Sequence, residues 1–166
     1  TENGRLVETE QEIYYPDVTH EYAVGFLRRH GTSGPASGKP FFLYYSSHLV
    51  HGPILRTPDS KPGTEDPTTL YNDNVAYLDK QVGLLVAELD RLGLRDDTLI
   101  VFSGDNGTVG QPSTIAGRQI NGVKGTMLEG GARVPLIANW EGGAPAERVL
   151  ADLVDFSDIL PTFVQA

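Results

Sequence analysis

The most constraining feature of the sequence is a helical stripe that lies between two short apolar runs. Large apolar side chains recur at spacings of three and four, at Tyr71, Val75, Leu78, Val82, Leu85, Leu89 and Leu92. This period predicts an amphipathic helix over about 72–92, with Gly93 as its C-terminal stop. The flanking runs 41–45 and 98–102 predict two buried strands. Strand, helix, strand is the pattern of a βαβ unit, so we expect parallel strands in one sheet and an α/β fold class.

Shorter elements are predicted on both sides of this unit. Apolar spacing predicts a helix over 18–29 that ends near Gly31, followed by a surface loop at 31–38. Four prolines exclude a regular helix across 51–67.

Two further elements are expected after the second run. Residues 133–138 predict a weaker strand, which Pro135 favours as an edge or irregular strand. Residues 155–164 predict a final helix, in which Pro161 fits only within the first turn.

Composition excludes several classes of protein. The 166 residues suit one domain or a piece of a larger one, and 13 basic against 22 acidic residues give a net charge of −9. This acidic balance argues against nucleic acid as a partner. No apolar run approaches the roughly 20 residues that a membrane-spanning helix needs. The absence of cysteine excludes disulfides, thiolate metal sites and thiol nucleophiles within these residues.

Two polar clusters directly follow the two predicted strands. His48 and His51 come after the first apolar run, and Asp105 and Asn106 come after the second. Ligands gather at the carboxyl ends of strands in open parallel sheets, so we expect these side chains to converge on an active site.

Each cluster has a chemical interpretation and a structural alternative. Asp105 and Asn106 offer oxygen ligands suited to calcium or magnesium, although Asp-Asn-Gly is also ordinary turn chemistry. His51 is suited to donating a proton to a leaving oxygen, and a hydrogen-bonded structural histidine is an equal alternative. Lys124, flanked by glycines, is suited to binding an anionic group, and its alternative is a solvated lysine on a surface loop.

At these clusters together the sequence resembles the sulfatase family of the alkaline-phosphatase-like superfamily. The ordered stretches that carry the resemblance are residues 40–53, 89–93, 98–107 and 122–135. Together they cover about 39–140. The whole chain, 1–166, is therefore expected to be one partial sulfatase catalytic domain. Residues 1–38 form an N-terminal segment outside the matching stretches.

The resemblance implies arylsulfatase-like hydrolysis of sulfate esters by part of a mixed, mainly parallel sheet flanked by helices. One divalent cation, usually calcium, would lie beside a formylglycine nucleophile. Asp105 and Asn106 would be metal ligands, and Asp105 would also accept a proton from the hydrated aldehyde. Lys124 would bind a sulfate oxygen and stabilise developing charge. His51 would lie against the leaving-group oxygen. His48 would be among the substrate-binding residues, although the resemblance gives it no defined role.

The sequence departs from the family in two respects. Members carry an earlier Cys- or Ser-x-Pro-x-Arg motif, whose first residue becomes formylglycine, and an earlier pair of acidic metal ligands; neither is present here. We therefore expect an internal or C-terminal part of a sulfatase, inactive alone, whose partners are a glycan or aryl sulfate ester and the missing N-terminal half. The resemblance suggests a periplasmic, secreted or lysosomal setting.

Two other functions stay open at this point. One is a phosphatase or phosphodiesterase of the same superfamily, although such enzymes resemble two-metal proteins with more histidine and aspartate ligands than the four histidines here allow. The other is a non-catalytic fragment that binds anionic glycans.

Overall fold

The computed structural model describes residues 4–5, 13–109 and 113–166 of the chain. The chain divides into two compact units, Thr1–Arg95 and Asp96–Ala166, and each is described by itself. In the part of the chain that the structure describes, no helix is long and apolar enough to cross a membrane.

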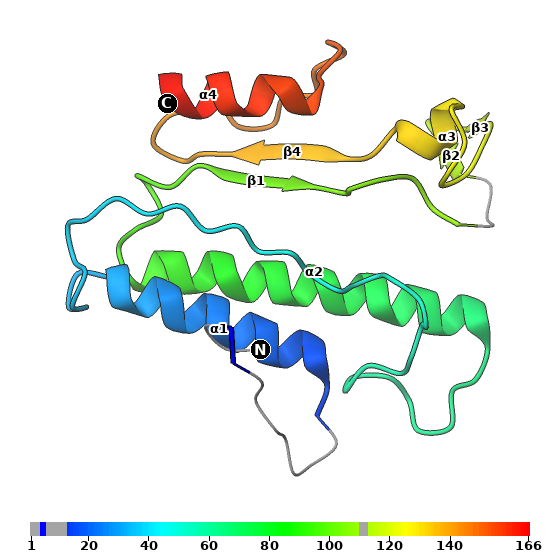
Figure 1. The fold of residues 1–166 in the computed structure, drawn as a ribbon, viewed down its shortest axis with the longest axis horizontal. Helices are drawn as coiled ribbons and strands as arrows, with labels where there is room; N and C mark the ends of the chain where they lie inside the picture. Colours follow the sequence, from blue (N-terminus) through cyan, green and yellow to red (C-terminus); the bar gives the residue numbers. More distant parts are fainter. Residues whose placement is uncertain (1–3, 6–12, 110–112) are drawn as a thin grey trace. The chain divides into compact units, whose positions relative to one another are not determined.

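The first unit contains two helices that lie side by side, α1 (Tyr15–His30) and α2 (Pro67–Arg91) (Figure 1). The helix predicted over 72–92 is therefore present, and it begins earlier because Asp66 caps it. The Asp66 carboxylate accepts a hydrogen bond from the Thr69 amide at 2.8 Å, and Pro67 occupies the first helical position. The helix predicted over 18–29 is likewise confirmed as α1.

The face of α2 that is buried differs from the predicted apolar stripe. The buried side chains of α2 are Asn74, Tyr77, Gln81, Glu88 and Leu89. Gln81 and Glu88 have polar partners on α1, whereas the Asn74 amide donates to the carbonyls of Leu55 and Leu70. Tyr71 and Val75, at the start of the stripe, are 39% and 44% exposed.

The strand predicted over 41–45 is not present. These residues form neither a strand nor a helix in the structure. Instead the segment packs one face on α1, where the ring centroids of Phe41 and Phe26 lie 5.8 Å apart. The alternate side chains of the segment point away from α1, and Phe42 and Tyr44 are 71% and 81% exposed. Side chains in this segment therefore alternate between a packed and an exposed face, as in a strand, although the segment is not paired as one.

The second unit contains the remaining elements. They are β1 (Ile100–Ser103), β2 (Ser113–Ile115), β3 (Arg118–Ile120), α3 (Glu129–Ala132), β4 (Leu136–Asn139), a 3-10 helix η1 (Phe156–Asp158) and α4 (Ile159–Gln165). The strand predicted over 98–102 is confirmed as β1, and the weaker strand becomes β4, which begins directly after Pro135. The predicted final helix is divided between η1 and α4, with Pro161 in the first turn of α4.

The strand pairing differs from the predicted parallel pair. β1 pairs antiparallel with β4, with Val101 opposite Ala138 (Figure 1). β2 and β3 form a second antiparallel pair that the sequence analysis missed. Their two-residue turn, Ala116 and Gly117, has φ of 49° and 77°. Positive φ at both positions is the geometry of a type I′ turn, but Ala-Gly lacks the Asn-Gly or Asp-Gly signature that predicts it.

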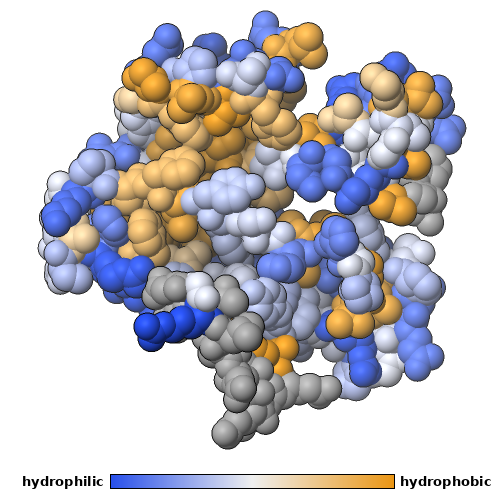
Figure 2. All heavy atoms as spheres, in the orientation of Figure 1, coloured by the Kyte–Doolittle hydropathy of each residue, from blue (hydrophilic) through white to orange (hydrophobic). Residues whose placement is uncertain are grey.

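Apolar side chains remain exposed near the C-terminal end of the second unit. Val149, Leu153 and Val164 are 100%, 99% and 80% exposed, and apolar surface is visible in Figure 2.

Candidate active site

Asp105 and Asn106 lie in the loop that leaves the end of β1, as the sequence predicted. The Asp105 side chain is exposed, and Asn106 is half-buried. The Asn106 Nδ2 donates a hydrogen bond to the carbonyl of Gly107 at 3.0 Å. This contact occupies the amide nitrogen and leaves the Asn106 Oδ1 able to bind a cation.

Lys124 lies in the loop between β3 and α3, and its backbone is tied to the loop after β1. The Lys124 amide donates to the carbonyl of Thr108 at 2.8 Å. At the preceding residue, the Gly107 amide donates to the carbonyl of Gly131 in α3 at 3.0 Å. These two hydrogen bonds hold the segment that follows Asn106 against the segment that carries Lys124. Three of the predicted site residues therefore lie on two loops that contact each other.

Glycines allow both loops to pack against the backbone of α3. A Cβ atom on Gly107 would lie 1.8 Å from the carbonyl oxygen of Gly130. A Cβ on Gly130 would lie 2.1 Å from the carbonyl oxygen of Gly122. No side chain fits at either contact, so the glycines of this stretch are required by space.

The carboxylate of Glu129, at the start of α3, joins the elements around the Lys124 loop. It accepts hydrogen bonds from Arg118 Nη2, at 2.9 Å to Oε1 and 3.1 Å to Oε2. Its Oε1 also accepts one from Arg133 Nη1. These interactions lower the pKa of Glu129, the hydrogen bond from Arg133 being the largest cause. The sequence analysis gave Glu129 no role, although a Glu four residues before an Arg is the spacing of a helical ion pair.

The donor set on these loops fits part of a calcium site. One carboxylate and one amide oxygen are hard ligands, but calcium takes six to eight oxygens. Among the described residues, no group of three or more His, Asp or Glu side chains is arranged to hold a metal. Asp105 and Asn106 are thus suited to contributing two ligands of a larger set.

His48 and His51 belong to the first unit. The His51 amide donates to the carbonyl of His48 at 2.9 Å, which closes a turn between them. The His51 Nδ1 lies 2.7 Å from the Gly52 carbonyl oxygen. A carbonyl only accepts, so Nδ1 carries a hydrogen and Nε2 faces away from this bond. The His48 ring instead lies edge-on to Tyr15, with centroids 4.7 Å apart.

A separate group of polar side chains lies between α1 and α2, where Tyr77 and Gln81 are buried and Asp17 is half-buried. The carboxylate oxygen Oδ1 of Asp17 accepts hydrogen bonds from Tyr77 Oη at 2.8 Å and Gln81 Nε2 at 3.0 Å. Burial and the Asp17 charge raise the pKa of Tyr77, so its hydroxyl stays protonated. His20, buried on α1, has a lowered pKa, mainly because burial disfavours its charged form.

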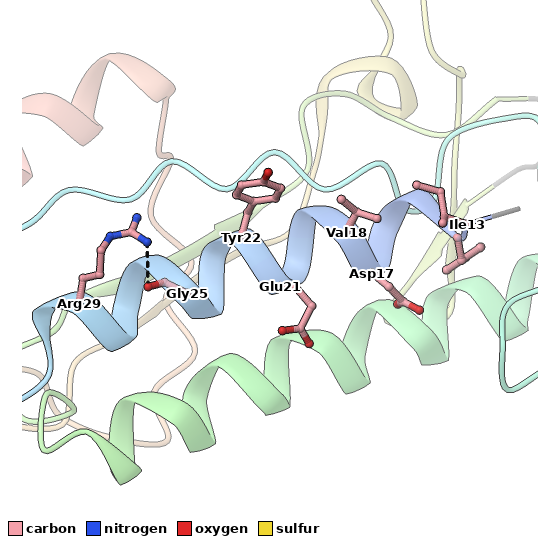
Figure 3. A pocket seen from close by; sticks show the side chains of 8 residues that line it. Ile13, Asp17, Val18, Glu21, Tyr22, Gly25 and Arg29 are labelled. Atoms are coloured by element: carbon pink, nitrogen blue, oxygen red, sulfur yellow. Dashed lines mark hydrogen bonds between the residues drawn. The ribbon is translucent and has the colours of Figure 1, made fainter. Parts of the chain in front are cut away.

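A shallow groove of about 610 Å³ runs along α1 beside this group. Figure 3 shows its side chains, including Tyr22 and Glu21, and the bond from Arg29 to the Gly25 carbonyl. None of the predicted site residues lines the groove.

Comparisons with known proteins agree on one family. The sulfatase family model matches residues 5–166. Arylsulfatase A of Bos taurus is 36% identical over 154 residues, which cover 92% of this chain and 30% of that protein. Arylsulfatase G of Mus musculus is 32% identical over 179 residues, covering 98% of this chain and 32% of that protein. The chain thus spans about a third of the length of these relatives.

Solved structures give the same result for the fold. A crystal structure of Ps i-CgsB in complex with k-i-k-neocarrahexaose superposes with a TM-score of 0.81 at 29% identity, covering 98% of this chain and 36% of that one. The chain therefore has part of the alkaline-phosphatase-like α/β fold that the resemblance implied. It belongs to the sulfatase family.

Proposed function

We propose that this chain supplies part of the active site of an enzyme that hydrolyses sulfate esters. The observation that carries the proposal is the contact between its two polar loops. In a member of the sulfatase family, the hydrogen bond from the Lys124 amide to the Thr108 carbonyl ties the lysine loop to the loop of Asp105 and Asn106. The ammonium group of Lys124 and the two proposed oxygen ligands of the metal ion are therefore carried by neighbouring segments. This arrangement is suited to binding an anion beside a metal ion.

Lys124 is proposed to bind a sulfate oxygen of the substrate. Its side chain is exposed, and its backbone is fixed by a hydrogen bond. An ammonium group beside the substrate stabilises the negative charge that develops on the sulfate oxygens during ester cleavage. Because the loop is held before the substrate arrives, little reorganisation is needed in the transition state.

Asp105 and Asn106 are proposed as two ligands of a calcium ion. Bound there, the ion would offset the charge of the sulfate group. The Asp105 carboxylate is exposed, and the Asn106 amide already has its nitrogen engaged by Gly107, so both residues present oxygen. The Asp105 carboxylate is also suited to holding a proton taken from an attacking hydroxyl group.

His51 is proposed to serve the leaving group. With Nδ1 engaged by the Gly52 carbonyl, the other ring nitrogen, Nε2, is the atom that would hold a proton for the leaving oxygen. His48 is proposed only as a neighbour on the substrate-binding side, because its ring is packed against Tyr15.

The substrate class is proposed to be a glycan or aryl sulfate ester. One further relative, 34% identical over 162 residues that cover 91% of this chain and 28% of that protein, is N-acetylgalactosamine-6-sulfatase of Canis lupus familiaris. Its name supports testing a sulfated amino sugar alongside an aryl sulfate.

Lys124→Ala in the complete protein tests the proposal. We expect kcat for p-nitrophenyl sulfate to fall by about 10²- to 10³-fold, the range for losing one charge-stabilising group in a transition state. The melting temperature should stay unchanged, because the Lys124 side chain is exposed and its anchoring contact comes from its backbone.

Lys39→Ala is the matched control, since Lys39 is an exposed lysine of the first unit. It should turn over the sulfate ester at the wild-type rate. Faster hydrolysis of p-nitrophenyl phosphate than of the sulfate would favour the phosphatase alternative. Glycan binding without hydrolysis of either ester would favour the non-catalytic one.

A further inference from the structure

The Lys124 loop depends on α3 for its position. The loop, residues 121–128, leaves β3 and runs directly into α3. Its first carbonyl, on Asn121, accepts a hydrogen bond from the Gly130 amide at 2.7 Å. Its last carbonyl, on Leu128, accepts one from the Gly131 amide at 2.9 Å. Both ends of the loop are therefore held by α3.

α3 is a poor helix by its own sequence. It has four residues, and two of them are the glycines that hold the loop. Glycine loses the most conformational freedom on folding, and a single helical turn is far below the length that is stable alone. No side chain caps its N-terminus either. Something outside the helix must therefore hold α3 in place.

The hydrogen bond from the Gly107 amide to the Gly131 carbonyl gives part of this support, and the side chain of Glu129 adds to it. Arg118 belongs to β3, before the loop, and Arg133 follows α3. Both guanidinium groups donate to the one Glu129 carboxylate, so the segments on either side of the loop are joined through it. A carboxylate that accepts from two guanidinium groups makes stronger, more directional bonds than a neutral amide does.

We propose that Glu129 is a positioning residue that fixes Lys124 through α3. The inference rests on the proposed function, in which Lys124 binds the sulfate group. Glu129 itself touches neither substrate nor metal in this account. It acts by holding the two glycine amides that clamp the loop, so that the lysine is already in place when a substrate binds.

A double-mutant cycle with Lys124 tests this role. In the complete protein, Glu129→Gln preserves the size of the side chain but removes its charge. We expect kcat/KM for p-nitrophenyl sulfate to fall about tenfold in the wild-type background. In the Lys124→Ala background the same change should cost less than about twofold, because the residue through which Glu129 acts is gone.

Arg118→Gln removes one of the two guanidinium contacts and leaves that of Arg133. It should give a smaller loss than Glu129→Gln, and the double variant should lose no more than Glu129→Gln alone. Glu147→Gln is the control, because Glu147 is an exposed residue of the same unit. It should keep the wild-type kcat/KM.

Hydrogen exchange gives a readout that does not depend on activity. In Glu129→Gln, the hydrogen-bonded amides of residues 121–131, those of Lys124, Thr126, Gly130 and Gly131, should exchange at least about tenfold faster, while those of β1 should keep their wild-type rate. An equal loss of kcat/KM in both backgrounds, or unchanged exchange in 121–131, would overturn the proposal. If the wild-type protein hydrolyses no sulfate ester, the proposed function is wrong, and the exchange result alone decides whether Glu129 fixes the loop.

Discussion

At the residue scale, Gly107 is the position where this site tolerates least change. The carbonyl oxygen of Gly130 occupies the space that a Cβ on Gly107 would fill, at 1.8 Å, and this oxygen belongs to the backbone. No rotation of a side chain relieves the clash, so the loop after β1 or α3 must move.

Gly107→Ala is therefore expected to destabilise the complete protein by about 1–3 kcal/mol, the range for overpacking. Urea unfolding followed by circular dichroism measures this. Gly83→Ala is the matched control, since nothing lies within 4 Å of a Cβ there and the position is exposed on α2. It should stabilise the protein by about 0.5–1 kcal/mol. Equal unfolding midpoints for the two variants would contradict the packing described here.

The sequence predicted the polar residues of the candidate site but not the groups that hold them. Asp105 and Asn106 were predicted because they follow a recognisable apolar run. Lys124 was predicted because glycines flank it. The contact between their loops consists of backbone hydrogen bonds, such as that from the Gly107 amide to the Gly131 carbonyl. Such bonds depend on tertiary packing and leave no pattern of residue types in the sequence.

At the element scale, Glu88 joins α1 to α2. Its carboxylate accepts hydrogen bonds from Arg28 Nε at 2.8 Å and from Arg91 Nη2 at 2.6 Å. Hydrogen bonds from Arg91, and then from Arg28, lower the pKa of Glu88 to about 2 against the opposing effect of burial. Because the pKa is lower in the folded protein, the stabilisation is present above about pH 4.5 and is lost as the pH falls towards 2.

Glu88→Gln should therefore lower the free energy of unfolding by about 1 kcal/mol at pH 7, a modest value because both arginines are more than half exposed. The difference from wild type should shrink as the pH falls from 4.5 to 2. Urea unfolding of the complete protein at pH 7 and pH 2.5 measures it. Glu65→Gln, at an exposed residue of the first unit, should cause no change at either pH. A difference of the same size at both pH values would show that charge pairing is not the cause.

Helices were more predictable from the sequence than strand pairing. The period of three and four found both α1 and α2, because a helix satisfies its backbone within one segment. Residues 41–45 have the apolar composition of a buried strand, but a strand requires a partner segment. The partner of β1, β4, comes after three intervening elements, and its direction cannot be inferred from local composition.

The buried face of α2 was mispredicted for a related reason. The apolar stripe gave the correct helix, but the side chains packed against α1 include Gln81 and Glu88. These polar residues are buried because Asp17 and Arg28 on α1 are their partners. A stripe of apolar residues identifies the side of a helix that avoids water, whereas specific polar pairs between helices depend on both sequences at once.

At the scale of the whole molecule, the second unit is proposed to carry part of a metal-assisted sulfate-ester site. The sulfatase family model matches residues 5–166, whereas the chain spans about a third of the length of its relatives. The activity therefore has to be measured on the complete protein. Asp105 is the residue on which the claim depends most, because its carboxylate is the only charged metal ligand proposed in this unit.

The most direct measurement is hydrolysis of p-nitrophenyl sulfate by the complete protein before and after calcium is removed with a chelator and restored. The wild-type protein should lose at least about 100-fold in kcat on chelation and recover it with added calcium. Asp105→Ala should be inactive and should not be rescued by calcium, while Asp90→Ala, at an exposed aspartate on α2, should behave as wild type. Wild-type turnover that survives chelation, or Asp105→Ala turnover equal to wild type, would contradict the assignment of this site.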